Sequence, residues 1–452
     1  MKNEDKTTSV VDESHHSKPI HKGEIPAIPA WIERAAWTEG MLTALQRDKS
    51  TKWYSLYDKL TSTGNLRAGW SYVRTRSKAT GVDRQSLAGF EKNHHEYIEK
   101  VQADLKSGDY RPSAAMRKWV PKLGSKQMRP IGISTVRDRV VHTAIKQIIE
   151  PIFERQFLDC SFGFRPERGT KDALRKVQSL LDQGHRWIVD ADIESFFDSI
   201  DHQVLTDALR TQIVDGKVLG LIDALVKQPV LDGKVRATPT KGTPQGSILS
   251  PLLANIYLHS MDQTLTKAGL NLVRYADDLV ILCRSEAEAI AALVALQTEY
   301  TRLKLKAHPE KTRIVSENTD GFEFLGYRFQ GGKRQPRDKS MKKWRANIKL
   351  RTPRNFGQSI SEAIKTVNTV VLGVVDYFQH VSYLSVFRKW DAFIRRRLRA
   401  ILLRQLGKSY TFGQGRAHNR WNNLWFADQG LISARVTYVA LKDAWNSARQ
   451  SR

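Results

Sequence analysis

The stretch RYADDLVILC, residues 274–283, places two adjacent carboxylates, Asp277 and Asp278, between short apolar flanks. The flanking segments NLVRY (271–275) and LVILC (279–283) predict a β-hairpin with a tight turn. Two like charges at a dry turn require a cation between them or one carboxyl that keeps its proton. Hard oxygen ligands without His or Cys favour Mg²⁺, so the sequence predicts a magnesium site here. The alternative is a solvent-facing Asp-Asp turn unrelated to chemistry.

Such a magnesium site calls for a third carboxylate, and RWIVDADI (186–193) supplies candidates. This β-rich segment predicts a strand, and SFFDSIDH (195–202) predicts a turn and then a helix. Asp190 and Asp192 share one face of the strand, so strand parity does not choose between them. Asp192 is preferred because it lies nearer the strand end. Two metal ions roughly 3.5–4 Å apart could then clamp an attacking and a leaving oxygen.

The charge balance indicates a polyanionic partner. The 452 residues include 73 Lys and Arg against 47 Asp and Glu, a formal net charge of +26. Such an excess favours nucleic acid through counterion release, although a merely soluble basic surface is the alternative. The chain is long enough for two or three domains, and 40% hydrophobic residues are compatible with a sizeable core.

Two features predict a cytosolic protein. The only cysteines, Cys160 and Cys283, provide neither a four-cysteine zinc site nor a disulfide framework. The first twenty residues lack an apolar core of signal-peptide length, and no later stretch approaches ~18 uninterrupted apolar residues. We therefore expect a protein that is not secreted and does not interact with a membrane.

The chain divides into four expected parts. Residues 1–30 are polar, contain three prolines and predict a mobile leader. Helical spacing over 137–158 predicts a long core helix that Pro151 should end or kink, a second helix is expected over 286–305, and 322–329 resembles one strand. Residues 333–354 hold ten Lys and Arg against one acid, so a domain boundary is expected near 333.

The motif Tyr-Ala-Asp-Asp at 275–278 resembles the YxDD signature of reverse transcriptases. The neighbouring blocks occur in that family's order and resemble those of group II intron-encoded reverse transcriptases, also called maturases. These blocks are RPIGISTVRDRVVHTA (129–144), SFGFRPERGTKDAL (161–174), ADIESFFDSIDH (191–202), GTPQGSILSPLLANIYLH (242–259), HPEKT (308–312) and FLGY (324–327).

The resemblance implies an α+β right-hand polymerase followed by helices. Fingers and palm, with antiparallel sheet, would occupy 31–332, and an α-helical thumb or maturase domain X would occupy 333–418. Residues 419–452 contain NRWNNLWFADQGLIS, which resembles the compact bacterial class C, and would form a short DNA-binding segment without an endonuclease domain.

The resemblance also implies a set of catalytic residues. Asp192, Asp277 and Asp278 would hold two Mg²⁺ ions together with the backbone carbonyl of Ile193, and Mn²⁺ is a possible substitute. Lys311 would lie near the leaving pyrophosphate as a proton donor.

Four residues would contact the incoming nucleotide. Phe197 would pack beneath the sugar and select deoxynucleotides, unless it is an ordinary core aromatic. Gln245 would contact the sugar and base. Lys122 and Arg129 would hold the triphosphate, although a general role facing RNA is an alternative for Lys122.

Nucleic-acid contacts are expected further along the chain. Leu325, Gly326 and Tyr327 resemble the primer grip, where a small residue lets the primer backbone pass. A basic helix face that could bind RNA or DNA, or be merely solvated, comprises Arg395, Arg396, Arg397 and Arg399.

The implied function is an RNA-directed DNA polymerase encoded by a group II intron. It would copy intron RNA into cDNA during target-primed retrohoming, with dNTPs, an RNA template, a DNA primer and target DNA as partners, and would bind the intron RNA to assist splicing. One alternative is a splicing cofactor whose polymerase is dispensable. Another is a defence or CRISPR-associated reverse transcriptase, because Ser247 stands where intron proteins often carry a second glycine.

Overall fold

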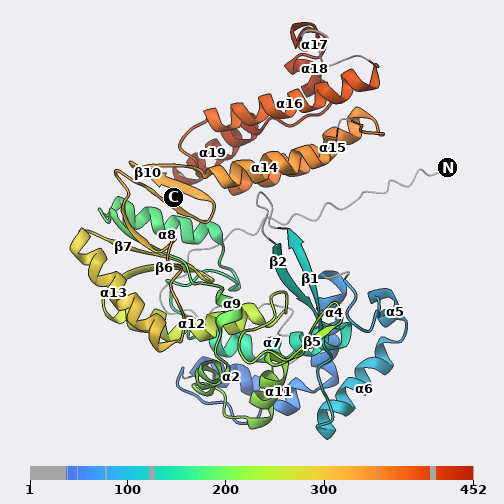
Figure 1. Ribbon diagram of the computed structural model, residues 1–452, viewed down its shortest axis with the longest axis vertical. Coiled ribbons are helices and arrows are strands. Elements are labelled where there is room, and N and C mark those ends of the chain that lie inside the picture. Colours follow the sequence, from blue (N-terminus) through green and yellow to red (C-terminus); the bar gives the residue numbers. More distant parts are fainter. Residues whose placement is uncertain are drawn as a thin grey trace, which may run out of the picture.

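The computed structural model describes residues 37, 39–47, 49–76, 79–121, 128–353, 355–407 and 414–450. The leader expected over residues 1–30, and Lys122, lie outside these residues. Figure 1 shows three regions, with the N-terminal helices in blue, a central sheet with green and yellow helices, and a C-terminal helical region in orange and red. This arrangement is the α+β right-hand fold of fingers, palm and thumb expected from the sequence.

The palm is built on a four-stranded antiparallel sheet in the order β6-β7-β3-β8. Its strands are β3 (Trp187–Ala191), β6 (Asn271–Tyr275), β7 (Asp278–Cys283) and β8 (Arg313–Ser316). Alternate residues of these strands enter two different cores, because Ile281 packs with α13 (Glu286–Arg302) while Val280 and Leu282 pack with α8 (Thr170–Asp182). Burial on both faces explains why β7 is an uninterrupted apolar run rather than an alternating one.

The fingers combine helices with a second four-stranded sheet, in the order β2-β1-β4-β5. Strands β1 (Ala115–Pro121) and β2 (Met128–Ile133) form an antiparallel hairpin, and β1 pairs in parallel with β4 (Val230–Asp232), which continues to β5 (Val235–Ala237). The helices that surround this sheet and lead into the palm are α2 (Glu39–Arg47), α3 (Tyr57–Leu60), α4 (Thr63–Arg76), α5 (Leu87–Lys92), α6 (His94–Ser107), α9 (Phe196–Ser199), α10 (His202–Arg210), α11 (Gly216–Val226) and α12 (Ser250–Lys267).

The long core helix expected over 137–158 is α7 (Val136–Glu154). It begins with the Thr135 side chain accepting the Asp138 N–H, which satisfies one of the free amides of its first turn. Pro151 lies inside the helix, which ends one turn later at Glu154. Nearly every residue of α7 is buried, so packing on all sides holds the last turn in place despite the proline.

The sequence predicts one strand over 322–329, but this segment forms two antiparallel strands joined by a turn. Strand β9 (Phe322–Phe324) turns at Leu325 and Gly326 into β10 (Tyr327–Gln330), which pairs with β11 (Lys333–Pro336). Leu325 and Gly326 have φ values of 47° and 83°, the left-handed backbone that reverses the chain within two residues. The boundary expected near 333 falls at the first residue of β11, so this small sheet extends past it.

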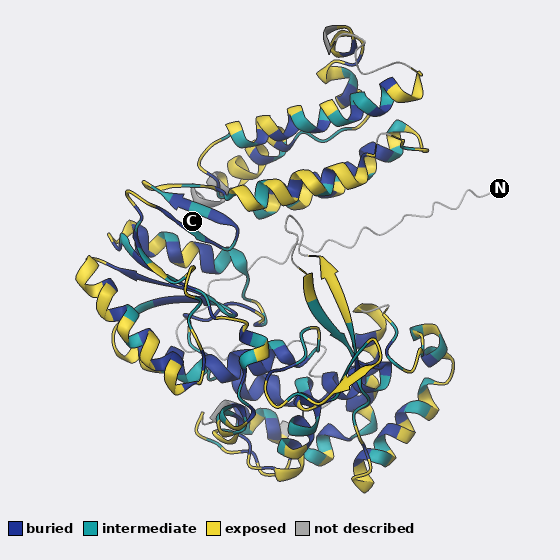
Figure 2. Cartoon of the chain, viewed as in Figure 1, coloured by how far each residue is buried: buried dark blue, intermediate teal, exposed yellow. Residues whose placement is uncertain are grey.

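The thumb consists of α14 (Asp338–Arg351), α15 (Ile360–Tyr377) and α16 (Ser385–Gln405), followed by α17 (Gln414–Arg420), α18 (Asn423–Asp428) and α19 (Ala434–Gln450). Buried residues line the inward sides of the three long helices in Figure 2. Phe324 and Phe329 of the palm hairpin belong to the same buried cluster as Trp344 and Trp390 of the thumb. The small sheet therefore joins palm and thumb through one hydrophobic core.

Across the described helices, none has both the length and the apolar character needed to cross a membrane. Cys160 and Cys283 are both free and buried.

Candidate active site

The two carboxylates of the opening motif lie at a two-residue hairpin turn, which confirms the predicted hairpin. Tyr275 pairs with Asp278 at the end of the β6–β7 ladder, so Ala276 and Asp277 form the turn. Ala276 has a φ of 60°, which lets the chain reverse between these strands. Asp278 is the first residue of β7, and its side chain is therefore held by the sheet rather than by a loop.

The third carboxylate, Asp192, lies beside this turn. The last pair of the β3–β7 ladder is Ala191 opposite Leu279, so Asp192 and Asp278 each lie one residue beyond that pair, at the same end of the two strands. The Asp192 carbonyl accepts the His308 N–H at 2.8 Å, and its carboxylate forms an ion pair with the Lys311 ammonium. The structure thus brings together Lys311 and Asp192, two of the site residues that the family resemblance implies.

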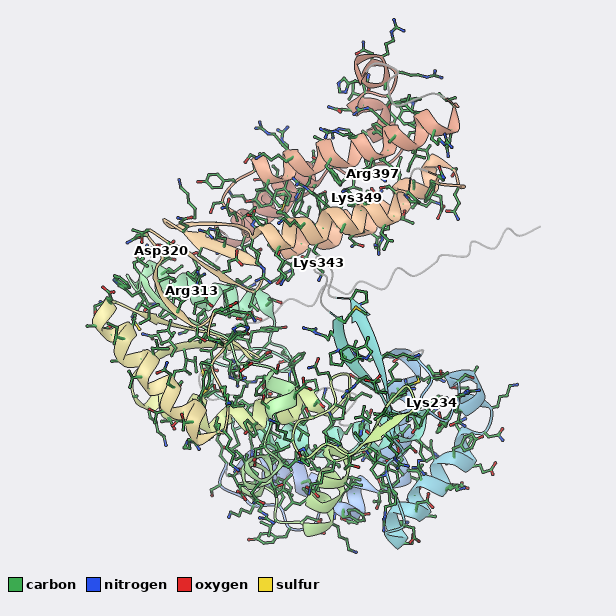
Figure 3. All side chains as sticks on the ribbon, in the orientation of Figure 1. Lys234, Arg313, Asp320, Lys343, Lys349 and Arg397 are labelled. Atoms are coloured by element: carbon green, nitrogen blue, oxygen red, sulfur yellow. The ribbon has the colours of Figure 1, made fainter. Side chains whose placement is uncertain are left out.

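Asp190, the competing candidate, has a different partner. Its carboxylate lies 3.6 Å from the guanidinium of Arg313 on β8, and Arg313 is labelled in Figure 3. Burial raises the pKa of Asp190 to about 6, while Arg313 opposes that shift. Asp190 is therefore a partly neutralised neighbour of the site.

Burial and the neighbouring carboxylates raise the pKa values of the aspartates at the turn. Burial, reinforced by the negative charges of Asp190, Asp277 and Asp192, raises the pKa of Asp278 to about 7. Burial also raises the pKa of Asp277; Asp192 adds to this effect, and Arg129 and Lys311 oppose it. A site that destabilises its own negative charges in this way favours a bound cation.

The donor set fits a hard divalent cation, although its side chains are not drawn together. Among the described residues, no three His, Cys, Asp or Glu side chains are close enough to hold a metal ion, and the Lys311 ammonium occupies the Asp192 carboxylate. Ile193 and Ala307 form an isolated antiparallel bridge, whose hydrogen bonds are accepted by the carbonyls of Asp192 and Lys306. The Ile193 carbonyl accepts neither of these two hydrogen bonds. Carboxylate and carbonyl oxygens are the ligands that Mg²⁺ prefers.

For the Mg²⁺ site expected from the sequence, the raised pKa of Asp278 predicts that the Mg²⁺ requirement depends on pH. Below pH of about 7 the neutral carboxylic acid dominates in the metal-free protein, and a neutral acid is a poor ligand. The Mg²⁺ concentration that gives half-maximal nucleotide incorporation should rise by up to about tenfold per pH unit below this value. Mg²⁺ titrations of primer extension above and below pH 7 would measure this rise, and an unchanged Mg²⁺ requirement would contradict the prediction.

Phe197 and Gln245 are brought together by the loop between β5 and α12. The Phe197 ring is half-buried and packs edge-to-face on Phe196, with 5.3 Å between centroids, while its carbonyl accepts the Thr243 N–H at 2.8 Å. The Gln245 amide donates to Asp198 at 3.4 Å. The Phe197 ring therefore packs against the core on one side, as the alternative of a core aromatic requires. The ring is only half-buried, so this packing is also compatible with a nucleotide contact.

Arg129 lies on β2 with an exposed side chain. It acts on the charge of Asp277, so the fingers hairpin directs positive charge toward the carboxylates. The Gly132 N–H donates to the Gln245 carbonyl at 2.6 Å and connects the same strand to the loop that carries Gln245. Strand β2 therefore carries Arg129, which acts on Asp277, and is also joined to the loop that carries Gln245.

Sequence reasoning missed the buried ion pair behind the turn. Arg274 is fully buried, and its guanidinium donates to Asp262 at 2.8 Å, to Asn255 at 2.9 Å and to the Ala276 carbonyl at 2.9 Å. Its remaining nitrogen donates to Ser161 at 2.8 Å. The sequence did contain a signal for this ion pair, namely an arginine within a strand expected to be buried. A buried charge requires partners of opposite charge or hydrogen-bond acceptors. These contacts hold the catalytic turn from behind.

The segment SFGFRP reinforces the same turn. The Phe162 N–H donates to the Arg274 carbonyl at 2.9 Å, and the Asn255 amide donates to the Gly163 carbonyl at 2.8 Å. A Cβ atom on Gly163 would lie 2.5 Å from the Ala276 nitrogen. Only glycine leaves room for the turn at this position.

Gly163→Ala is therefore expected to displace the catalytic turn. Because the clash is with backbone, relief requires movement of the turn, and overpacking of this kind costs about 1–3 kcal/mol. Primer extension should fall at least about tenfold, while chemical denaturation would measure the cost in stability. Gly220→Ala on α11 is the matched control, since its Cβ would contact nothing within 4 Å. Activity equal to that of the control would show that the contact is unimportant.

The predicted primer-grip residues are only partly accessible. Tyr327 is fully buried, and its hydroxyl donates to the Tyr377 carbonyl at 2.6 Å, so the prediction of a nucleic-acid contact is wrong for this side chain. The carbonyls of Leu325 and Gly326 accept the hydroxyls of Tyr377 and Ser340, at 2.8 and 3.0 Å. The turn is thus fastened to the thumb, and the half-buried Leu325 is its more accessible side chain.

The four predicted thumb arginines do not share one basic face. At 100° per residue, positions 395, 396, 397 and 399 spread around α16, and only Arg396 is exposed. The Arg397 guanidinium donates to the Thr352 carbonyl, and the Arg399 guanidinium donates to the Trp421 carbonyl at 2.9 Å. Arg397 and Arg399 therefore connect α16 to neighbouring segments, which corrects the expectation of a common binding face.

Comparison with protein families identifies the class. The model for reverse transcriptase (RNA-dependent DNA polymerase) matches residues 120–329, which include all three aspartates. The model for the group II intron maturase-specific domain matches residues 341–421, which cover most of the thumb. The chain is a member of the reverse transcriptases.

Individual relatives narrow this class. Protein YkfC of Escherichia coli (strain K12) is 34% identical over 271 residues, which cover 51% of this chain and 70% of that protein. The group II intron-encoded protein LtrA of Lactococcus lactis subsp. cremoris is 39% identical over 192 residues, which cover 42% of this chain but only 31% of LtrA. The chain belongs to the family of group II intron-encoded reverse transcriptases, or maturases.

Among solved structures, a chain of the partial Cas6-RT-Cas1–Cas2 complex is 21% identical with a TM-score of 0.36, over 55% of this chain and 41% of that chain.

Proposed function

We propose that this protein copies the RNA of a group II intron into cDNA during target-primed retrohoming, and that it binds the same RNA to assist splicing. The observation that carries the proposal is the convergence of Asp192, Asp277 and Asp278 at one end of the palm sheet, in a chain whose thumb matches the maturase-specific domain. The primer is the 3′ end of target DNA, and dNTPs are the substrates.

Each residue around the aspartates has a role in nucleotidyl transfer. Bound Mg²⁺, or Mn²⁺ in its place, would lower the pKa of the primer hydroxyl and neutralise charge on the reacting phosphate. The hairpin fixes the backbone positions of Asp277 and Asp278, and these two carboxylates, together with Asp192, would hold the ions. Lys311 would donate a proton to the leaving pyrophosphate, and its ion pair with Asp192 supports this role.

The nucleotide is held by residues of the fingers and the adjoining loop. Arg129 contacts the triphosphate, and its planar guanidinium suits bidentate phosphate binding. The free side of the Phe197 ring packs beneath the sugar and excludes a 2′-hydroxyl. Gln245, which can donate and accept, contacts the sugar and base.

The maturase role rests on the positive surface of the thumb. Helix α14 buries Trp344 and Ile348 and exposes a row of basic residues, two of which, Lys343 and Lys349, are labelled in Figure 3. The exposed basic residues of this helix are Lys339, Lys342, Lys343, Arg345, Lys349 and Arg351. Such a helix binds phosphates largely without regard to base sequence. The free, buried cysteines agree with a bacterial cytosolic location.

The test measures cDNA synthesis and splicing in parallel. Purified protein is given an RNA template annealed to a DNA primer, dNTPs and Mg²⁺, with a chelated sample as control, and separately the precursor RNA of its own intron. Both activities are expected, and chelation should abolish synthesis. Splicing without synthesis would replace this proposal with that of a splicing cofactor, and synthesis without any effect on splicing would remove the maturase role.

A further inference from the structure

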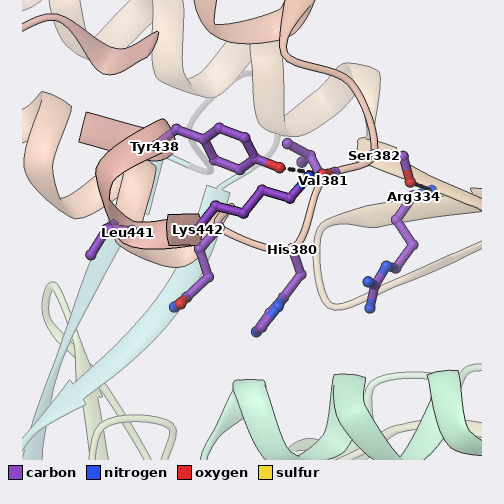
Figure 4. Close-up of a pocket in the computed structure, with 8 residues that line it drawn as sticks. Arg334, His380, Val381, Ser382, Tyr438, Leu441 and Lys442 are labelled. Carbon is purple, nitrogen blue, oxygen red and sulfur yellow. Dashed lines mark hydrogen bonds between the residues drawn. The ribbon is translucent and has the colours of Figure 1, made fainter. Parts of the chain in front are cut away.

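A cavity on the thumb is not accounted for by the polymerase site. It has a volume of about 260 Å³ and is lined by parts of the chain far apart in sequence, namely Arg334 on β11, residues 379–382 after α15, and Tyr438, Leu441 and Lys442 on α19. Figure 4 shows this pocket, with Arg334 and His380 pointing the same way, toward the green helix below them. A volume of this size holds several water-sized groups.

The pocket is rigidly built. Arg334 and Ser382 are joined by two hydrogen bonds, from the Arg334 N–H to the Ser382 hydroxyl at 2.9 Å and from the Ser382 N–H to the Arg334 carbonyl at 2.8 Å. The buried Tyr438 hydroxyl donates to the Val381 carbonyl at 2.7 Å and fastens α19 to the same loop. Polar groups are thus fixed around the cavity before any ligand binds, which lowers the entropic cost of binding.

The charge of the pocket is positive. None of the described residues that line it is acidic, while Arg334 and Lys442 are cationic. Within the described part of the chain, neither side chain forms a hydrogen bond or ion pair, although Arg334 is half-buried and burial lowers its pKa. A partly buried cation without a partner is costly unless an anion is supplied.

The nearby acids are already engaged. Asp182, which acts on Arg334 from a distance, accepts the Gln178 amide at 2.6 Å, and Asp376 pairs with Lys171 at 2.8 Å. Neither carboxylate lines the pocket.

His380 supplies an unused hydrogen-bonding group. Its Nε2 atom is buried and has no partner among the described residues. Burial, with the positive charges of Arg334, Arg175 and Lys171, lowers the pKa of His380 to about 4, while Asp376 opposes this shift. The imidazole is therefore neutral at pH 7, and the tautomer protonated at Nε2 can donate to an oxygen without adding charge.

We propose that this pocket binds a phosphate group, namely one backbone phosphate of the nucleic acid that the protein carries. Arg334 and Lys442 neutralise the phosphate, and the Ser382 hydroxyl and His380 Nε2 donate to its remaining oxygens. The fork of donors on Arg334 matches two phosphate oxygens. This inference rests on the proposed function in that nucleic acid is taken as the source of the phosphate.

The test is the salt dependence of nucleic-acid binding by the full-length protein. Labelled RNA hairpin and labelled RNA–DNA primer–template are titrated with wild type and with the double variant Arg334→Gln/Lys442→Gln, at several salt concentrations. The variant should bind at least one probe about 5- to 30-fold more weakly at low salt, and the slope of log K against log salt should fall by about 1, the value for one lost phosphate. His380→Gln should give a smaller loss in the same direction.

The matched control removes the same charges elsewhere, as Arg210→Gln/Lys100→Gln, at two exposed positions on α10 and α6. If the control variant loses as much nucleic-acid affinity as the pocket variant, the proposal that the pocket binds a phosphate is wrong. Unchanged nucleic-acid binding, with calorimetric binding of inorganic phosphate to wild type but not to the double variant, would overturn nucleic acid as the source. Because the assay involves no synthesis, a wild type that binds but makes no cDNA would overturn the proposed function and leave the pocket standing. Thermal melting of each variant excludes unfolding as the cause.

Discussion

Asp278→Asn should lower the rate of cDNA synthesis about 10³-fold or more while leaving RNA binding intact. The proposed Mg²⁺ would supply several kcal/mol of charge stabilisation in the transition state, and about 1.4 kcal/mol corresponds to each tenfold in rate. An amide in place of the carboxylate loses most of this contribution. Single-turnover primer extension and binding of labelled RNA by the same preparation would measure both effects.

The matched control is Asp190→Asn, at a position on β3 two residues before Asp192. The Asp190 carboxylate forms an ion pair with Arg313 at 3.6 Å. Replacing Asp190 by Asn should therefore reduce synthesis less than about tenfold. A loss as large as that of Asp192→Asn would mean that Asp190, rather than Asp192, is the third ligand. Because Asp278 is destabilised as an anion, Asp278→Asn should not lower the free energy of unfolding, which separates loss of chemistry from loss of structure.

The second large effect concerns the ion pair behind the turn. Asp262→Asn leaves the fully buried Arg274 guanidinium without its counter-charge, and breaking such a pair costs about 3–5 kcal/mol. Synthesis should fall as well, because the same guanidinium holds the Ala276 carbonyl. Chemical denaturation gives the free energy of unfolding, and primer extension below the unfolding range gives the activity.

Lys227→Gln provides the comparison for an exposed pair. Lys227 pairs with Asp223 at 2.8 Å on the surface of α11, and its loss should change stability by less than about 0.5 kcal/mol. An Asp262→Asn variant as stable as Lys227→Gln would show that Arg274 finds other partners. A variant that is less stable but fully active would show that the turn does not depend on the pair.

Local sequence patterns were sufficient for the catalytic turn. Two short apolar runs around Asp277 and Asp278 predict a hairpin, because two strands so close in sequence can pair only in the antiparallel sense. Asp192 was chosen from its place at the strand end, and it lies one residue beyond the last pair of the β3–β7 ladder, at the end where Asp278 begins β7. The resemblance to maturases supplied the order of the remaining blocks and thereby the fold.

The wrong predictions concern residues whose environment is determined by tertiary contacts. Tyr327 was expected to contact nucleic acid because of its resemblance to the primer grip, but a two-residue turn at Leu325 and Gly326 folds it into the core beneath the thumb. The basic run at 395–399 looks like a surface, but helical geometry turns Arg397 and Arg399 toward other segments. The partner of Arg274 is twelve residues away in sequence and on another element, which no local pattern reveals.

The core shared by the palm hairpin and the thumb has a consequence for how the chain can be divided. The family matches leave a gap between residues 329 and 341, which invites expression of the polymerase part alone. A chain cut there would expose Phe322, Phe324 and Phe329 to water, because Trp344 and its neighbours would no longer cover them. We expect such a fragment to aggregate. The maturase region therefore also covers apolar surface of the palm hairpin, and a polymerase fragment would need that surface covered in another way.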